Sequence, residues 1–250
     1  MKNSVRVKTF TLDELQGCQR CPKLRQQFKQ LRVRYPDYWN RPVAGAGPET
    51  ASLLLVGLAP GLHGANRSGI PFEGDSSGDL LHKTLGKLGL SGSVRITNVL
   101  KCLPKQNKPS TEELGRCHRF FEAEIDSFCA GGGRAIFALG RVAHERVLKT
   151  LGLRLALYPF AHSAVHRLSP ELTLVDSYHC SRYNTQTGRL TETMFRLALR
   201  QAAKAAGVLT AKGSSAKSSV AMQAAANGLP TSRSGAKKKN KTVKIKPKKS

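Results

Sequence analysis

Residues 134–152 read RAIFALGRVAHERVLKTLG, a short apolar run that ends in glycine and is followed at once by apolar residues at helical spacing. The first part predicts a buried strand and the second predicts an amphipathic helix. Strands are also predicted over 52–57 (SLLLVG), 94–100 (VRITNVL) and 172–179 (LTLVDSYH). Strands that alternate with helices indicate βαβ units. The predicted fold class is therefore α/β, with four mostly parallel strands.

Further helices are predicted over 79–89, 111–128 and 191–207. Ser110, followed by Glu113 three residues later, is a capping-box signal for the start of the second of these. In open parallel sheets, ligands bind beyond the carboxyl ends of the strands. Four loops are therefore expected to carry the chemistry, and they follow Gly57, Leu100, Gly140 and Tyr178.

The charge of the chain is strongly positive and unevenly distributed. The 250 residues include 41 Lys and Arg against 16 Asp and Glu, which gives a net charge of +25. Residues 208–250 hold 11 of the basic residues and no acidic one, which leaves a net charge of +14 in residues 1–207. We predict a globular domain over 1–207 and a disordered basic tail over 208–250, because the tail has few large apolar residues. The tail is either a tether for phosphates or a solvated charge run without a specific role.

The composition excludes several classes of protein. No apolar run approaches the roughly 18 residues of a membrane span, and the first residues have no apolar core of a secretory signal. We therefore expect a cytoplasmic, nucleoid-associated protein whose partner is nucleic acid first, an anionic membrane second. Six cysteines are too few for a disulfide scaffold in a chain of this length, so clustered cysteines indicate metal ligands or buried thiols.

Four of the cysteines form two sequence pairs. Cys18 and Cys21 make a CxxC pair, and Cys102 and Cys117 make a looser one. A tight CxxC turn directs two sulfurs to one ion or cluster, and a second pair completes a four-sulfur set. Spacing alone leaves zinc, an iron–sulfur cluster and unligated thiols open. The basic residues around these cysteines are expected to lower the pKa of the thiols.

The loop after the first strand, residues 57–75, contains five glycines, which let a backbone approach a ligand closely. It lacks both the GxGxxG pattern and the P-loop lysine, so dinucleotide or triphosphate binding has little support. Phe72 offers an aromatic face on which a nucleobase could stack, although a core position is the plainer interpretation.

The loop after the fourth strand is polar and begins with a histidine. His179 lies at the strand end, where a catalytic role competes with a structural one. Arg182 and Arg189 could hold phosphates, and Tyr183 or Gln186 could reach into a groove.

Three stretches together resemble one known family. They are GLAPGLHGANRSGIPFEGD (57–75), ITNVLKCLPKQNKP (96–109) and SYHCSRYNTQTGRLT (177–191). Their combination, in this order, is similar to the iron–sulfur branch of the uracil-DNA glycosylase superfamily, and within it to the type-5, or b-type, group. The resemblance extends from about residue 11 to residue 207. It implies a three-layer αβα fold with a four-stranded, mostly parallel sheet. It also implies a 4Fe-4S cluster, whose ligands would be Cys18, Cys21, Cys102 and Cys117.

The resemblance assigns roles to individual residues. The catalytic residues would be Asp75, His179 and Asn107. Base-binding residues would be Phe72, Leu58, Ala59 and Gly57, and DNA-binding residues would be Arg182, Tyr183, Asn184 and Arg189. Two departures from the wider superfamily pattern stand out: residues 58–59 are apolar where related glycosylases often carry a polar residue, and Cys180 replaces a proline after the histidine.

The function implied is a monomeric DNA repair enzyme that hydrolyses the N-glycosidic bond of uracil, and of other deaminated bases such as hypoxanthine and xanthine, to leave an abasic site. It is expected to be monofunctional, since no lysine is placed for Schiff-base chemistry. Its partner would be DNA, with the tail on the phosphate backbone, and it would not bind a membrane. The alternative is a non-catalytic iron–sulfur DNA-binding module of the same fold. A zinc-stabilised RNA-binding protein is a third interpretation, which rests only on charge and the CxxC pair.

Overall fold

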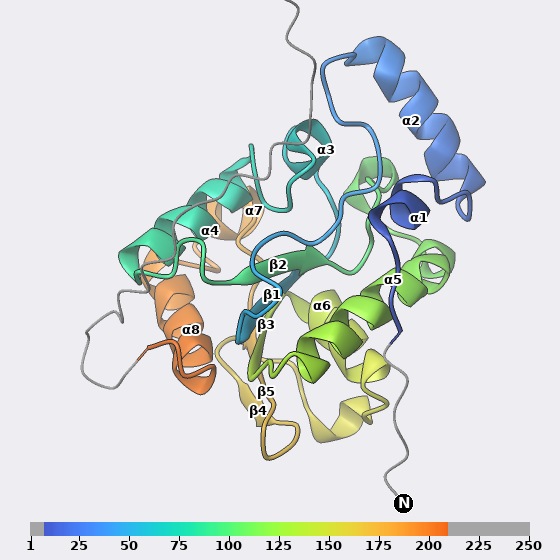
Figure 1. The fold of residues 1–250 in the computed structure, drawn as a ribbon. Helices are drawn as coiled ribbons and strands as arrows, with labels where there is room; N and C mark the ends of the chain where they lie inside the picture. The colour runs from blue at the N-terminus through green and yellow to red at the C-terminus, as the bar shows by residue number, and fades with distance from the viewer. Residues whose placement is uncertain (1–7, 210–250) are drawn as a thin grey trace, which may run out of the picture. The chain divides into compact units, whose positions relative to one another are not determined.

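A computed structural model describes residues 8–209, so nearly all of the predicted basic tail lies outside the described residues (Figure 1). The described part contains a five-stranded sheet in the order β2-β1-β3-β5-β4. Its strands are β1 (Leu53–Gly57), β2 (Arg95–Asn98), β3 (Ala135–Leu139), β4 (Val165–Arg167) and β5 (Thr173–Ser177). Neighbouring strands among β2, β1, β3 and β5 pair in parallel. The predicted α/β class and the four parallel strands are confirmed.

The predicted strand number of four is wrong, because β4 adds a fifth strand that runs antiparallel to β5. This strand has only three residues, two of them exposed, at the edge of the sheet. A short edge strand with little buried surface has no apolar run or long alternation in its sequence.

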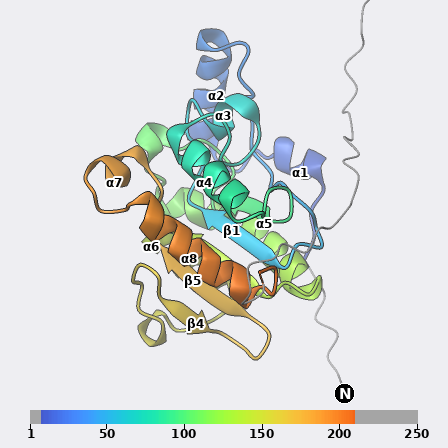
Figure 2. The same ribbon diagram turned by 90° about the vertical axis from the view of Figure 1, so that its left-hand side faces the viewer.

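Helices cover both faces of the sheet, as the two ribbon views show (Figures 1 and 2). One face packs on α4 (Ser76–Lys87) and α8 (Glu192–Ala205), and the other packs on α5 (Thr111–Ala130) and α6 (Arg141–Thr150). Alternate residues of the strands divide between these two cores, because successive side chains of a strand point to opposite faces. Leu53 and Leu55 of β1 belong to the first core, and Leu54 and Val56 to the second. The three-layer prediction is confirmed.

The predicted capping box is present at α5. The Ser110 hydroxyl accepts a hydrogen bond from the Glu113 amide, and the Glu113 carboxylate accepts one from the Ser110 amide. The helix predicted to begin at 79 begins at Ser76 instead, because Asp75 caps it. Helices α1 (Leu12–Gln16), α2 (Pro22–Arg34), α3 (Ala65–Ser68) and α7 (Arg182–Gln186) were not predicted.

Two features of the described residues bear on function. None of their helices has the length and apolar character that a membrane crossing requires. The carboxyl ends of β1 and β2 lie side by side, since Gly57 pairs with Asn98 in the parallel register. The loops after β1, β2 and β5 therefore meet at one edge of the sheet.

Candidate active site

A cavity of about 340 Å³ opens at that edge of the sheet. It draws its walls from the loops after β1, β2 and β5, as expected for an α/β sheet. Most of the predicted catalytic and base-binding residues meet here, namely Leu58, Ala59, Phe72, Asp75, Asn107 and His179. Residues that lie more than a hundred positions apart in the sequence thus share one cavity.

Asp75 holds its carboxylate in a fixed orientation. Its Oδ1 accepts hydrogen bonds from the amides of Ser77 and Gly78, each at 3.0 Å, at the N-terminus of α4. The other oxygen, Oδ2, lies against two glycines: a Cβ atom added to Gly64 would be 2.2 Å from Oδ2, and one added to Gly61 would be 3.1 Å away. The helix end thus orients the side chain, and the missing side chains of the loop keep space beside Oδ2.

Phe72 is buried and takes a positive φ of 57°, a conformation that is costly for a bulky residue. Its ring centroid lies 6.1 Å from that of His179. A Cβ atom on Gly57 would be 2.5 Å from the Phe72 ring and 2.4 Å from Oδ1 of Asn98. Gly57 was predicted to bind the base, but it does not line the cavity. It instead makes room for the Phe72 ring, which does line the cavity.

His179 follows β5 and lies partly buried at the cavity wall. Burial lowers the pKa of its imidazole below the ordinary value of 6.5, and the charge of Asp75 opposes this shift more weakly. A neutral imidazole at neutral pH carries one N–H donor. Asn184, predicted to bind DNA, donates its side-chain amide to the His179 carbonyl at 2.8 Å and so holds the loop.

Asn107 lies on the segment after β2, at the end of a short 3-10 helix. Its φ is 57° and that of the preceding Gln106 is 52°, so two successive residues without a glycine take the left-handed conformation. Asn107 is exposed at the rim of the cavity. Such backbone strain is found preferentially at functional sites.

Asn98 also lines the cavity, and the sequence analysis did not select it. It is the last residue of β2, only 3% exposed, and its Oδ1 is buried without a hydrogen-bond partner among the described residues. A buried amide oxygen of this kind lacks the compensation that polar groups normally have. The strand was predicted to extend to residue 100, so Asn98 was not placed at its carboxyl end, where ligands bind.

The remaining predicted DNA-binding residues lie beside the cavity rather than in it. Arg182 and Tyr183 are exposed on α7, with Tyr183 71% accessible to solvent. Arg189 lies over the ring of Tyr178, with its guanidinium carbon 4.6 Å from the ring centroid. These side chains can reach a long ligand whose reacting part occupies the cavity.

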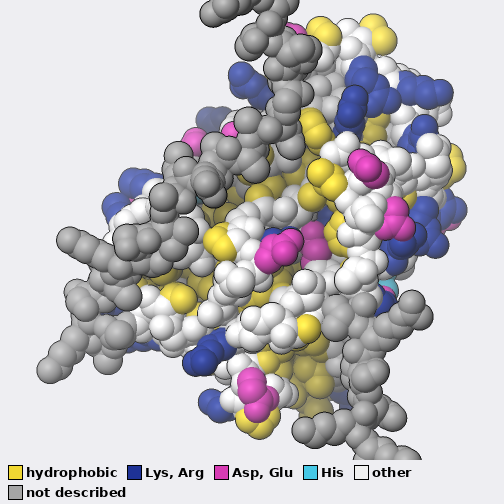
Figure 3. All heavy atoms as spheres, in the orientation of Figure 1, with side chains coloured by type: hydrophobic (Ala, Val, Ile, Leu, Met, Phe, Trp, Pro, Cys, Tyr) yellow, Lys and Arg dark blue, Asp and Glu magenta, His cyan; other side chains and the backbone are white. Residues whose placement is uncertain are grey.

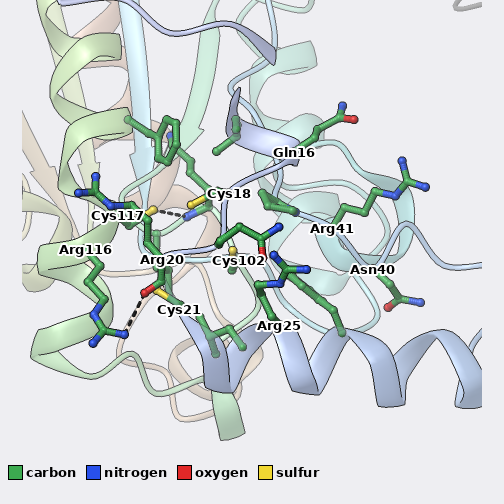
Figure 4. A pocket seen from close by; sticks show the side chains of 18 of the residues that line it. Gln16, Cys18, Arg20, Cys21, Arg25, Asn40, Arg41, Cys102, Arg116 and Cys117 are labelled. Atoms are coloured by element: carbon green, nitrogen blue, oxygen red, sulfur yellow. Dashed lines mark hydrogen bonds between the residues drawn. The ribbon is translucent and has the colours of Figure 1, made fainter. Parts of the chain in front are cut away.

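A second cavity, of about 280 Å³, gathers the four predicted cysteine ligands (Figure 4). Cys18 and Cys21 come from the turn between α1 and α2, Cys102 follows β2, and Cys117 lies on α5. Arg116 on α5 contacts the turn between α1 and α2, because its Nη1 donates a hydrogen bond to the carbonyl of Arg20 at 2.9 Å.

The pKa of three of these thiols is raised rather than lowered, contrary to the prediction. Burial raises the pKa of Cys117 to about 11 and that of Cys102 well above 9.0. The pKa of Cys21 is also raised, chiefly by burial, and the charge of Arg116 opposes this shift more weakly. Desolvation therefore outweighs the neighbouring positive charges.

Two observations test which metal group these residues fit. Arg25 lines the cavity, and its Nη1 is buried without a hydrogen-bond partner among the described residues, as suits a bound group with negative charge. The four sulfurs are also not within 4.8 Å of one another; in the described range only His144, His166 and Asp176 meet that criterion. The four thiols are therefore not arranged around a single zinc ion in this structure.

Comparisons with known proteins agree with the fold class. Residues 44–203 match the sequence model of the uracil DNA glycosylase superfamily. The type-5 uracil-DNA glycosylase of Thermus thermophilus is 42% identical over 212 residues, which are 78% of this chain and 96% of that protein. The type-5 enzyme of Pyrobaculum aerophilum is 39% identical over 217 residues, 79% of this chain and 93% of that protein. A type-4 uracil-DNA glycosylase of the same organism is 31% identical over 142 residues, 56% of this chain and 64% of that protein.

Proposed function

The chain belongs to the type-5 group of the uracil DNA glycosylase superfamily, and on that premise we propose that it hydrolyses the N-glycosidic bond of uracil in DNA and leaves an abasic site. One observation carries the proposal: an aromatic ring, a carboxylate and a neutral imidazole, on Phe72, Asp75 and His179, converge on one cavity. The target base must leave the helix to reach such a cavity, which costs a few kcal/mol and least for a mismatched base.

The two polar side chains act on the two charges that develop when the bond breaks. The departing base becomes negative, and the N–H of His179 stabilises it by a hydrogen bond that strengthens as the charge grows. The sugar becomes positive, and Oδ2 of Asp75 stabilises it or orients a water molecule towards its anomeric carbon. Oδ1 stays bound to the helix N-terminus, so the carboxylate does not need to reorient.

Recognition of the base combines stacking with a hydrogen bond. Phe72 provides the flat contact, and the unpaired Oδ1 of Asn98 accepts an N–H from the edge of the base. Leu58 and Ala59 present only apolar surface at positions where a polar side chain would select among bases. We extend the proposal to hypoxanthine and xanthine for this reason. No lysine is among the described residues that line the cavity, which supports monofunctional hydrolysis without strand cleavage.

The test is excision from a duplex that contains a single uracil opposite guanine. Wild-type protein should produce abasic sites, detected as alkali-labile breaks, with no breaks before the alkali treatment. Asp75→Asn should lose at least a hundredfold in single-turnover rate. Asp79→Asn is the matched control, because Asp79 is exposed one turn farther along the same helix and does not line the cavity.

A panel of uracil, hypoxanthine and xanthine in single- and double-stranded DNA measures the breadth of the substrate range. If fully loaded and folded protein excised none of these bases, the proposal would be wrong. If that protein still bound DNA, the non-catalytic DNA-binding module would be the better description.

We also propose that Cys18, Cys21, Cys102 and Cys117 hold a 4Fe-4S cluster, supported by their shared cavity and by the unpaired Arg25 donor. Such a cluster would act as a structural crosslink between the N-terminal turn, the segment after β2 and α5. Purified protein should be brown and contain about four irons per chain, and Cys117→Ser should lower the iron content. Stoichiometric zinc with no iron would overturn this part of the proposal without affecting the cavity.

A further inference from the structure

The segment that follows α2 brings aromatic rings and arginines together outside the cavity. The rings of Tyr35 and Tyr38 stack with centroids 4.7 Å apart at 19°. Arg34 lies over the Tyr35 ring at 5.3 Å, and Arg41 lies over the Trp39 ring at 5.7 Å. Both arginines are exposed, and the rings are partly so.

The loop after β1 completes this surface. The His63 ring stands edge-on to Tyr35 and Tyr38, and its Nδ1 is 3.0 Å from the hydroxyl of Tyr38. Arg67 lies over the Tyr38 ring at 5.7 Å. A hollow of about 380 Å³ is lined by Tyr38, Trp39, Arg41 and Arg67, among others. We call these four residues, with His63, the Tyr38 surface.

Buried hydrogen bonds hold the two segments of the Tyr38 surface together. Asn40 and Asn66 are fully buried, and the Asn66 side-chain amide donates to Oδ1 of Asn40 at 2.9 Å. The amide of Trp39 donates to the carbonyl of Arg67, and that of Asn40 to the carbonyl of Asn66. The surface is therefore formed before any ligand binds, and it is anchored to the same loop that carries Phe72 and Asp75.

The charge around this surface suits a polyanion. Residues 22–42 contain six Lys and Arg against a single acidic residue, Asp37. Lys and Arg side chains gather over α2 in the space-filling view (Figure 3). Aromatic rings interleaved with arginines on a basic surface bind single strands, since the rings stack on unpaired bases and the arginines hold phosphates.

We propose that the Tyr38 surface is a second DNA subsite, at which an unpaired base of a single strand stacks on the face of Tyr38 opposite Tyr35. The base takes the place of the exposed Arg67 side chain, and neighbouring phosphates then lie against Arg41 and the displaced Arg67. This deepens the proposed function, because it places a stretch of unpaired DNA beside the cavity that takes the damaged base. A duplex does not offer the free base face that stacking requires, so the subsite distinguishes single-stranded from double-stranded DNA.

The test measures binding of full-length protein to a fluorescent oligothymidylate, which contains no uracil. Tyr38→Ala should lower the affinity roughly 5- to 150-fold, the range for loss of one stacked base. Tyr38→Phe keeps the ring and loses only the hydroxyl near His63, so it should bind like wild type. Arg154→Ala is the charge control, because Arg154 is an exposed arginine after α6 and is not part of the surface.

The salt dependence separates stacking from phosphate contact. Arg67→Ala should reduce the slope of log affinity against log salt by about 0.7, whereas Tyr38→Ala should leave the slope unchanged. Thermal melting checks that each variant is folded. Folded Tyr38→Ala and Arg67→Ala proteins that bind the oligonucleotide like wild type would overturn the proposal, as would an equal loss for Tyr38→Phe and Tyr38→Ala. Since no base is excised, the result can be interpreted whether or not the protein proves to be a glycosylase.

Discussion

Asp75 uses its two carboxylate oxygens differently, and the surrounding glycines make this possible. Oδ1 is bound by the amides of Ser77 and Gly78, whereas Oδ2 lies in space that Gly61 and Gly64 leave free. A carboxylate held at one oxygen is already aligned before substrate binds, which is what electrostatic stabilisation of a transition state requires. In the proposed mechanism, the glycines of this loop would contribute by leaving space beside Oδ2.

Gly64→Ala tests this interpretation, because its new Cβ atom would be 2.2 Å from Oδ2 of Asp75. The carboxylate must then move, and a displacement of about 1 Å can cost on the order of a hundredfold in rate. We expect single-turnover excision of uracil to fall by that amount. Gly61→Ala, whose Cβ atom would be 3.1 Å from the same oxygen, should have a smaller effect. Equal rates for the two variants and wild type would show that the position of Oδ2 is unimportant.

The lowered pKa of His179 predicts the acid side of the pH profile. Burial lowers this pKa below 6.5, so the folded protein takes up the proton at a lower pH than the unfolded chain does. Activity should therefore persist at pH 6.5 and fall only at lower pH. In the window between the folded and unfolded pKa values, the unfolded chain binds more protons, so stability falls as the pH falls. His179→Gln should flatten this part of a plot of the free energy of unfolding, measured by urea denaturation, against pH. An unchanged slope would contradict the role of His179 in this pH dependence.

At the scale of the elements, a buried ion pair joins β2, the segment that follows it, and α5. Lys101 is 1% exposed, and its Nζ donates to Oε2 of Glu124, to Oγ1 of Thr97 at 2.6 Å and to the carbonyl of Asn98 at 2.8 Å. All three of its protons are thus used. Glu124 also accepts from Thr97 and from the amide of Gly45. The network fixes the backbone of Asn98, whose side chain faces the base cavity.

Lys101→Met should destabilise the protein by about 3–5 kcal/mol, because it leaves Glu124 charged and unpaired in the interior. The free energy of unfolding from urea denaturation measures this. The double variant Lys101→Met with Glu124→Leu should recover most of the loss, since both charges are then gone. Iron content should be compared in the same samples, because Cys102 is the next residue. A double variant as unstable as the single one would mean that the hydrogen bonds of the network, and not only the balance of its two charges, stabilise the protein.

How well the elements could be predicted depended on how much each one buries. The central strands and α5 were found because they are continuous apolar runs or carry a capping signal. Helix α2 was not, because only Leu24 and Phe28 of its 13 residues are buried and the rest read as a polar stretch. Strand β4 was also not predicted, because it is an edge strand of three residues that buries little surface.

The motifs selected residues that the structure brings to one cavity, but they did not select a residue that only the geometry reveals. Phe72, Asp75, Asn107 and His179 were chosen from their motifs, and they line the same cavity. Asn98 was passed over because it stands inside an apolar run, and its unpaired oxygen becomes apparent only once β1 and β2 are aligned.

In the described domain, one segment serves both cavities. Asn98 lines the base cavity, the one that contains Asp75, and Lys101 and Cys102 line the cysteine cavity. Pro104 and Asn107, farther along the same segment, line the base cavity again. A crosslink at Cys102 would therefore restrain the same stretch of chain that presents Asn98 and Asn107 to the base. The proposed cluster would in this way support the geometry of the base-binding residues.

At the scale of the whole chain, the charge of the basic tail alone predicts a contribution to DNA binding. Residues 208–250 contain 11 Lys and Arg and no acidic residue, and such a segment binds phosphates in a salt-dependent way. Removing residues 210–250 should weaken binding to any duplex at low salt and reduce the slope of log affinity against log salt, by about 0.9 for each phosphate that the tail neutralises. The excision rate at saturating protein should not change, because the residues that line the base cavity lie between 58 and 181. A truncated protein with an unchanged salt slope would mean that the tail does not bind DNA, whereas a slower saturating rate would mean that it acts on the reaction itself.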